Sequence, residues 1–128
     1  DNIKDMYKFK TPALRNVSLT APYGHNGAYP TLKGIIKQHL NPIKMNKSWK
    51  PAYANLPNAP WLKQIDFVTF SDKREQDRIL SSINIQPVDL DEKEIDQLVL
   101  FLESLTGKSG NQRPFGKPIK VPSGLTID

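Results

Sequence analysis

The sequence of 128 residues contains no cysteine. Cysteine supplies disulfides, thiolate metal ligands and the covalent attachment points of c-type haem, so this segment forms none of these by itself. Histidine and methionine are also scarce, with two of each in the chain. Any metal ligand of the imidazole or thioether type in this segment must therefore come from this small set.

Long apolar runs and blocks of like charge are missing as well. No run approaches the roughly 20 apolar residues of a membrane-spanning helix. The formal charge of +5 arises from lysines and arginines spread along the chain. We therefore expect no membrane span and no nucleic-acid partner, and instead some attraction to acidic partners. Residues 1–5 lack the apolar core of a signal peptide, so we expect that any export signal lies upstream or has been removed.

Eleven prolines and seven glycines divide the chain into short pieces. Proline interrupts helices and central strands, so long uninterrupted elements are not expected. The sequence predicts an all-α fold of short helices with long ordered loops. The expected segments are a loop over 1–30, a helix over 31–41, an insertion over 42–90, a terminal helix over 91–107 and an extended tail over 108–128.

A short helix is predicted after Thr31, whose hydroxyl can cap it. Asn41 and Pro42 are expected to end it. Four side chains recur at helical spacing and share one face. They are Leu32, Ile35, Ile36 and His39. The pattern predicts a buried stripe whose last member is an imidazole.

A second helix is predicted from Asp91, which forms a capping-box pattern with Glu94. Apolar residues then repeat at helical spacing, and Gly107 is expected to end the helix. A more polar helix is predicted between Ser71, as its cap, and about Ser82. Residues 42–70, between the helices predicted after Thr31 and after Ser71, are rich in proline and aromatic residues. Trp49 and Trp61 in this region could shape an electron route or pack, and packing is the favoured role.

Both histidines lie in the first third of the chain. His25 is in a loop flanked by Gly24 and Gly27, where the backbone can closely approach a flat ligand. His39 is on the helix predicted after Thr31. A histidine on an apolar face is more often a structural residue than a metal ligand, and the residues alone leave both roles open. Met6 and Met45 are alternative sulfur ligands, for which gap-filling in the core is the favoured role.

Three stretches resemble the C-terminal haem domain of the di-haem cytochrome c peroxidase/MauG family. Residues 9–27 read FKTPALRNVSLTAPYGHNG, residues 98–107 read LVLFLESLTG, and residues 121–125 read VPSGL. The resemblance covers most of the chain outside 43–85. It implies a partial cytochrome c-like haem domain, namely the C-terminal part of the second haem domain.

The resemblance also implies roles for individual residues. His39 occupies the position of the second axial haem ligand, which is a methionine in typical peroxidases and a tyrosine in MauG. His25 matches a loop histidine near the haem, with a purely structural role as the alternative. Arg15 offers a planar cation suited to a haem propionate, with a local carboxylate as the alternative partner. Thr20 and Pro22 match positions whose backbone carbonyls help to bind calcium in the family.

In this family, haem c is attached by a C-x-x-C-H motif upstream of the segment that matches residues 9–27. The expected cofactors are therefore haem c, attached outside this chain, and calcium. The expected partners are the upstream part of the same protein, a small electron-donor cytochrome or cupredoxin, and hydrogen peroxide. A homodimer is left open, and a periplasmic or otherwise exported location is expected.

The function implied by the resemblance is peroxide reduction, with electrons relayed through the C-terminal haem. Because His39 replaces methionine, a MauG-like oxidase acting on a protein or organic substrate is a rival interpretation. A haem-free binding or scaffold remnant is a second rival, and an unrelated helical interaction domain is a third. No catalytic residue is expected in this segment, which is interpreted as supplying an iron ligand and pocket residues.

Overall fold

The computed structural model describes residues 5–24, 26–56, 59–62, 65–108 and 110. Every regular element in these ranges is helical, and an isolated bridge joins Tyr23 to Tyr29. The predicted all-α fold with short helices is confirmed. None of the described helices is long and apolar enough to cross a membrane. His25 and the part of the predicted tail beyond Gly110 lie outside the described residues.

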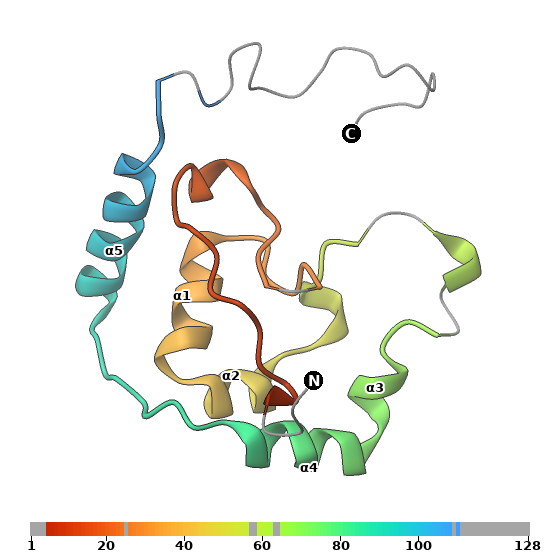
Figure 1. Cartoon of the computed structure of the whole chain (residues 1–128). Helices are drawn as coiled ribbons and strands as arrows, with labels where there is room; N and C mark the ends of the chain where they lie inside the picture. Colours follow the sequence, from red (N-terminus) through yellow and green to blue (C-terminus); the bar gives the residue numbers. More distant parts are fainter. Residues whose placement is uncertain (1–4, 25, 57–58, 63–64, 109, 111–128) are drawn as a thin grey trace.

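Five α-helices and three short 3-10 helices make up the described fold (Figure 1). The 3-10 helices are η2 (Val17–Leu19), η3 (Pro51–Tyr53) and η4 (Pro60–Leu62). The α-helices are α1 (Leu32–Leu40), α2 (Pro42–Ser48), α3 (Val68–Ser71), α4 (Lys73–Ser82) and α5 (Glu92–Ser104).

Helix α1 is central to the packing, because it contacts both α2 and α5 (Figure 1). Leu32 and Ile36 are one helical turn apart on α1 and are both buried. Ile95 of α5 is the most buried apolar residue, at 4% exposed, and Tyr23 completes this core. The buried core of the described residues is therefore small.

The predicted end of the first helix at Asn41 is confirmed, but a second helix begins at the next residue. Asn41 ends α1 and also caps α2, since its side-chain carbonyl accepts the Lys44 N–H at 3.0 Å. Pro42 is the first residue of α2. Proline is favoured at this position because the N–H that it lacks would have no partner inside the helix. The same Asn-Pro pair therefore stops one helix and starts another.

The rest of the insertion is more structured than its prolines suggest. Asp72, rather than the predicted Ser71, caps α4, because its carboxylate accepts the N–H groups of Arg74 and Glu75. The expected packing role of Trp49 is confirmed by its edge-on contact with Phe70, at 5.2 Å between ring centroids.

Two further packing expectations are wrong. Trp61 is 78% exposed, and Met6, at 52% exposed, fills no gap in the core.

Helix α5 begins with the predicted capping box. Asp91 accepts the Glu94 N–H at 2.8 Å, and the Glu94 carboxylate accepts the Asp91 N–H at 2.8 Å. The helix ends at Ser104, so Gly107 is not its immediate stop. A backbone bond from Val88 N–H to the Leu40 carbonyl, at 2.9 Å, attaches the preceding connection to the end of α1.

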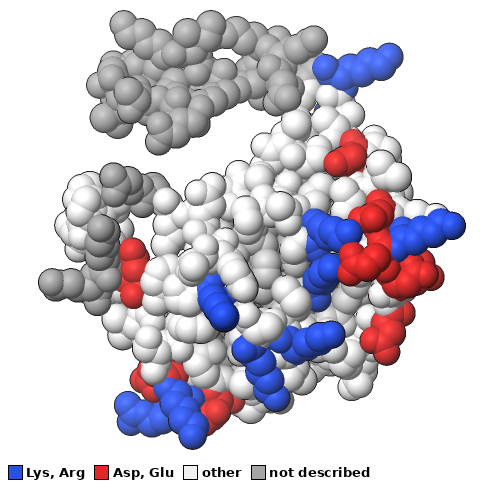
Figure 2. Space-filling view, turned by 180° about the vertical axis from the view of Figure 1, so that it is seen from behind, with Lys and Arg blue, Asp and Glu red and all other residues white. Residues whose placement is uncertain are grey.

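Ion pairs reinforce the contact between α1 and α5. Lys33 contacts Glu92 at 2.9 Å and Asp96 at 2.6 Å, and Lys37 contacts Glu92 at 2.6 Å. These bonds hold the pKa of Glu92 down, at about 2, with the Lys37 bond as the largest cause. Figure 2 shows basic and acidic side chains lying next to one another on the side of the molecule that carries α5.

Large apolar side chains remain exposed over much of the surface. On α5 alone, Leu98, Leu100 and Phe101 are 37%, 64% and 57% exposed. Leu98 and Phe101 are three residues apart and therefore lie on one side of the helix. An exposed apolar surface of this kind commonly marks a contact with further protein or ligand.

Candidate functional site

His39 lies in the last turn of α1. The helix is fixed at its start by Thr31, whose hydroxyl accepts the Gly34 N–H at 3.1 Å. It is fixed along one side by the buried residues Leu32 and Ile36. The core and the cap thus set the direction of the helix that presents the imidazole.

The expected burial of His39 is wrong, because its side chain is exposed in the structure. Its Nδ1 lies 2.9 Å from the Ile35 carbonyl oxygen. A carbonyl only accepts, so this bond requires the proton on Nδ1, and in the neutral tautomer the lone pair is then on Nε2. Nε2 has no hydrogen-bond partner among the described residues. An exposed imidazole with one nitrogen oriented by a backbone carbonyl is suited to bind a metal through its other nitrogen.

The loop that carries His25 is closed by the bridge at its base. Tyr23 N–H donates to the Tyr29 carbonyl at 2.7 Å, and Tyr29 N–H donates back at 3.1 Å. Within the loop, Gly24 and Gly27 adopt positive φ angles of 85° and 68°, which favour glycine. His25 itself lies outside the described residues, but the two ends of its loop are fixed.

Two side chains attach this loop to its surroundings. The Trp49 indole N–H donates to the Ala28 carbonyl at 3.0 Å. The Tyr29 hydroxyl donates to the side-chain carbonyl of Gln38, on α1, at 2.6 Å. Burial raises the pKa of Tyr29, so the hydroxyl stays protonated as the donor in this bond. The loop and the helix that carries His39 are therefore joined directly.

Arg15 is exposed and forms no ion pair with a carboxylate in the described part of the chain. The alternative of a local carboxylate partner is thus not seen there. The next residue, Asn16, is in the left-handed region with φ 59°. Its N–H donates to the Leu105 carbonyl at 3.2 Å, and its side-chain carbonyl accepts the Gly107 N–H at 2.8 Å.

Ser18 adds a further contact to the same region, because its hydroxyl lies 2.5 Å from the Thr106 hydroxyl. We call Asn16, Ser18 and residues 105–107 the Asn16 cluster. This cluster was not predicted from the sequence. An asparagine in an irregular segment is nevertheless a known signal for the left-handed conformation. The cluster joins the segment containing Arg15 to the end of α5.

Thr20 and Pro22 lie in the same segment and are exposed. The Thr20 hydroxyl donates to the Val17 carbonyl at 2.9 Å. The described residues contain no group of three or more histidine, cysteine or carboxylate side chains that could hold a metal ion. A calcium site in this segment would therefore have to draw on backbone carbonyls and on oxygen ligands from elsewhere.

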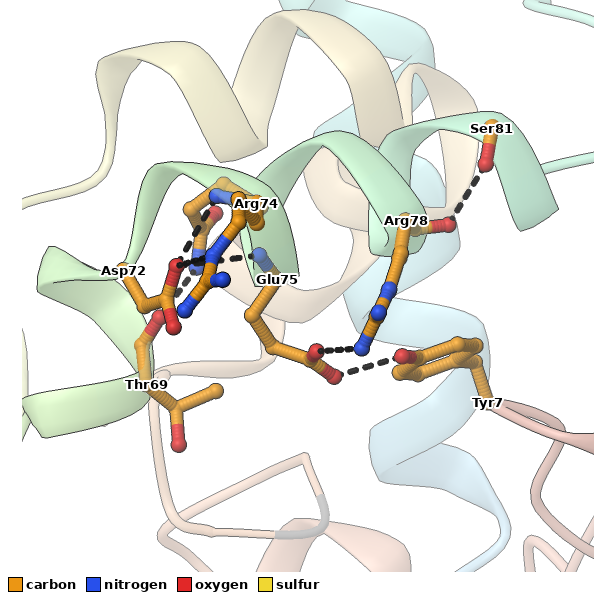
Figure 3. A network of polar contacts seen from close by, with 8 residues as sticks. Tyr7, Thr69, Asp72, Arg74, Glu75, Arg78 and Ser81 are labelled. Carbon is orange, nitrogen blue, oxygen red and sulfur yellow. Dashed lines mark hydrogen bonds and ion pairs between the residues drawn. The ribbon is translucent and has the colours of Figure 1, made fainter.

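A second polar cluster attaches the start of the chain to α4 (Figure 3). The Tyr7 hydroxyl donates to the Glu75 carboxylate at 2.5 Å, and Arg78 contacts the other carboxylate oxygen at 3.3 Å. The hydrogen bond to Glu75 raises the pKa of Tyr7. Tyr7 thus remains a neutral donor, and the cluster's evident role is to anchor the N-terminal segment.

Comparison with known proteins gives several matches to one group of redox proteins. The chain is 36% identical over 106 residues to the methylamine utilization protein MauG of Paracoccus denitrificans, a match covering 79% of this chain. It is 56% identical over 37 residues to the cytochrome c peroxidase Ccp of Escherichia coli. This chain is related to the MauG and cytochrome c peroxidase family. The relationship expected from the sequence resemblance is confirmed.

The matched proteins are much longer than this segment. The cytochrome c peroxidase IdrP1 of a Pseudomonas strain is 49% identical over 35 residues, or 27% of this chain. The chain spans 23% of the length of MauG and 8% and 9% of the two peroxidases. No family model and no solved structure matches the chain. The activity of a whole protein of this family therefore depends on residues outside this segment as well.

Proposed function

We propose that residues 1–128 form the C-terminal part of the second haem domain of a di-haem c-type cytochrome, with His39 as an axial ligand of the haem iron. We call the longer protein that contains this segment the full-length protein. Its upstream part would carry the C-x-x-C-H motifs that attach haem c. When bound, the haem supplies one-electron transfer, and the residues of this segment supply a ligand and part of the pocket.

The arrangement of His39 is the observation that carries this proposal. The bond from Nδ1 to the Ile35 carbonyl fixes the ring and leaves Nε2 as an exposed electron-pair donor. Iron-binding histidines commonly donate their other N–H to a carbonyl or carboxylate in this way. The donor set present in this structure therefore fits a haem iron.

The exposed apolar surface supports the placement of this segment in a larger domain. Leu98 and Phe101 on α5 would be covered by the upstream part of the full-length protein. Haem is itself a large apolar group, and a pocket around it would cover further side chains. The small core of the isolated segment agrees with an incomplete domain.

For the full-length protein we propose peroxide reduction, with electrons passing through the haem that His39 binds. A small cytochrome or cupredoxin would donate the electrons, and a periplasmic or otherwise exported location would follow from the attached haem c. Arg15 would bind a haem propionate, and His25 would lie near the haem. The carbonyls of Thr20 and Pro22 would contribute to a calcium site between the two haem domains.

The proposal is tested by spectroscopy on the full-length protein produced in a host that exports and attaches haem c. His39→Ala removes the proposed ligand, while His25→Ala serves as the matched control. We expect a low-spin electron paramagnetic resonance signal that becomes high-spin in His39→Ala and stays low-spin in His25→Ala. Added imidazole should restore the low-spin signal of His39→Ala. An unchanged signal in His39→Ala would refute the assignment.

A MauG-like oxidase is the second candidate, and one observation favours it. The match to MauG covers 79% of the chain, whereas the match to the Escherichia coli peroxidase covers 29%. Turnover with hydrogen peroxide and a reduced cytochrome supports the peroxidase, while oxidation of a protein or organic substrate supports the oxidase. A stably folded full-length protein without haem would support the scaffold remnant instead.

A further inference from the structure

The Asn16 cluster fixes the backbone next to Arg15 through long-range hydrogen bonds. The N–H and the side-chain carbonyl of Asn16 bond to Leu105 and Gly107 respectively, at 3.2 and 2.8 Å. Asn16 and Gly107 are 91 positions apart in the sequence. A single residue thus makes two hydrogen bonds to a distant part of the chain.

The backbone conformation of Asn16 and the narrow space around Gly110 both suit the residues at these positions. Asn16 has φ 59°, a region that asparagine tolerates better than most residues other than glycine. A Cβ atom on Gly110 would lie 2.9 Å from Leu19 Cδ1 and 3.4 Å from Asn16 Oδ1. The chain after α5 therefore approaches the Asn16 segment so closely that a side chain at position 110 would require Leu19 Cδ1 to shift.

Arg15 has no comparable support of its own. Its side chain is exposed, and no carboxylate in the described part of the chain pairs with it. The direction in which the Arg15 side chain leaves the backbone therefore depends on how firmly the two Asn16 bonds hold the adjoining chain. An unpaired guanidinium on a fixed backbone is well prepared to bind an anion that arrives from outside this segment.

We infer that Asn16 is a positioning residue, which through its bond to Gly107 directs Arg15 toward a carboxylate of the bound haem. The inference rests on the proposed function and adds to it the reason why Arg15 is oriented to bind a haem propionate. A guanidinium near a propionate stabilises the ionised carboxylate and offsets its negative charge. Weakening that contact should lower the midpoint potential of this haem, because the reduced iron loses part of the compensating positive charge.

The test compares three variants of the full-length protein with haem bound. Asn16→Gly allows the left-handed backbone and keeps the N–H that bonds to Leu105, but it removes the side-chain bond to Gly107, so the chain next to Arg15 is held less firmly. Ser18→Ala is the matched control, since it removes the hydroxyl contact with Thr106 in the same cluster and leaves both Asn16 bonds in place. Arg15→Gln removes the proposed propionate partner. The readouts are the midpoint potential of the haem that His39 binds and the thermal midpoint of unfolding.

We expect Asn16→Gly to lower the potential in the same direction as Arg15→Gln, and Ser18→Ala to leave it unchanged. Combined with Arg15→Gln, Asn16→Gly should add no further shift, because both act through one contact. Equal shifts in Asn16→Gly and Ser18→Ala, additive shifts in the double variant, or no shift in Asn16→Gly would each overturn the inference.

A second variant and an independent spectrum distinguish a failure of this inference from a folding defect and from a failure of the proposed function. If Asn16→Gly does not accumulate with haem, Asn16→Ser provides a second variant with a shortened side chain, and the same comparison applies. The spectrum of His39→Ala tests the proposed function independently. A His39→Ala variant that turns high-spin, together with an unshifted potential in Asn16→Gly, would retain the haem assignment and remove only the positioning role.

Discussion

The indole of Trp49 and the backbone carbonyl of Ala28 are joined by a hydrogen bond of 3.0 Å across 21 positions of sequence. Trp49 also packs edge-on against Phe70, in the short helix α3. One side chain thus connects the insertion to the loop that carries His25. The insertion consequently helps to hold this loop in place.

Trp49→Phe should destabilise the full-length protein by about 1 kcal/mol, because it removes one part-buried hydrogen bond and keeps an aromatic ring. Urea unfolding followed by circular dichroism gives the free energy. The amides of Tyr23 and Tyr29 should exchange with deuterium faster in this variant. Trp61→Phe is the control, since Trp61 is 78% exposed and its change should stay within about 0.5 kcal/mol.

The capping box of α5 provides a second prediction. Asp91→Ala should cost about 1 kcal/mol of unfolding free energy, because the Glu94 N–H loses its acceptor. Asp91→Asn keeps an acceptor and should cost less. Lys93→Ala, on the same turn but outside the capping box, is the control. A cost for Asp91→Ala no greater than that of Lys93→Ala would show that the cap contributes little.

The Glu92 ion pairs predict a stability change with pH. The pKa of Glu92 is about 2 in the fold, against an ordinary value of 4.5. A carboxylate with a depressed pKa binds fewer protons when folded, so its contribution is fully present above about pH 4.5 and is lost as the pH falls toward 2. Since both partners are exposed, the effect should be small and should shrink with added salt.

The measurement for this prediction is the denaturation midpoint of the full-length protein across that pH range. Glu92→Gln should flatten the acid-side loss of stability relative to the unchanged protein. Asp89→Asn is the matched control, because Asp89 is exposed and forms no ion pair in the described residues. A Glu92→Gln profile that falls as steeply as the unchanged profile would contradict the assignment of this effect to Glu92.

Replacing His39 by methionine should change the haem potential in a known direction. Methionine with histidine as the axial pair raises the potential relative to two histidines. His39→Met in the full-length protein should therefore stay low-spin and show a higher midpoint potential in a redox titration. A potential at or below that of the unchanged protein would indicate that His39 is not bound to iron.

The sequence correctly predicted the helix caps at Thr31 and Asp91, which depend on residues three or four positions apart. The capping box of Asp91 and Glu94 and the cap at Thr31 are bonds within one turn, and their residues are visible as short patterns. The boundary at Asn41 was predicted less well. There the pattern indicates that a helix ends, but the same residues also favour the start of α2.

The exposure of His39 could not be obtained from periodicity. The stripe places it on the face of Leu32 and Ile36, but burial also requires something to cover that face. In the described structure α1 contacts α2 and α5 and its residues Leu32 and Ile36 are buried, whereas His39, one turn beyond Ile36, is exposed. Periodicity therefore predicts the helix face on which a histidine lies, whereas the packing of other elements determines whether that histidine is buried.

By itself the sequence determined the all-α class, the two capped helices and the relationship to the MauG and cytochrome c peroxidase family. Only the tertiary structure decided that Trp49 reaches Ala28 and that Asn16 reaches Gly107, 91 positions away. Local bonds follow from the adjacent side chains and the geometry of one helical turn. Bonds over such distances depend on the path of the whole chain, which no short pattern specifies.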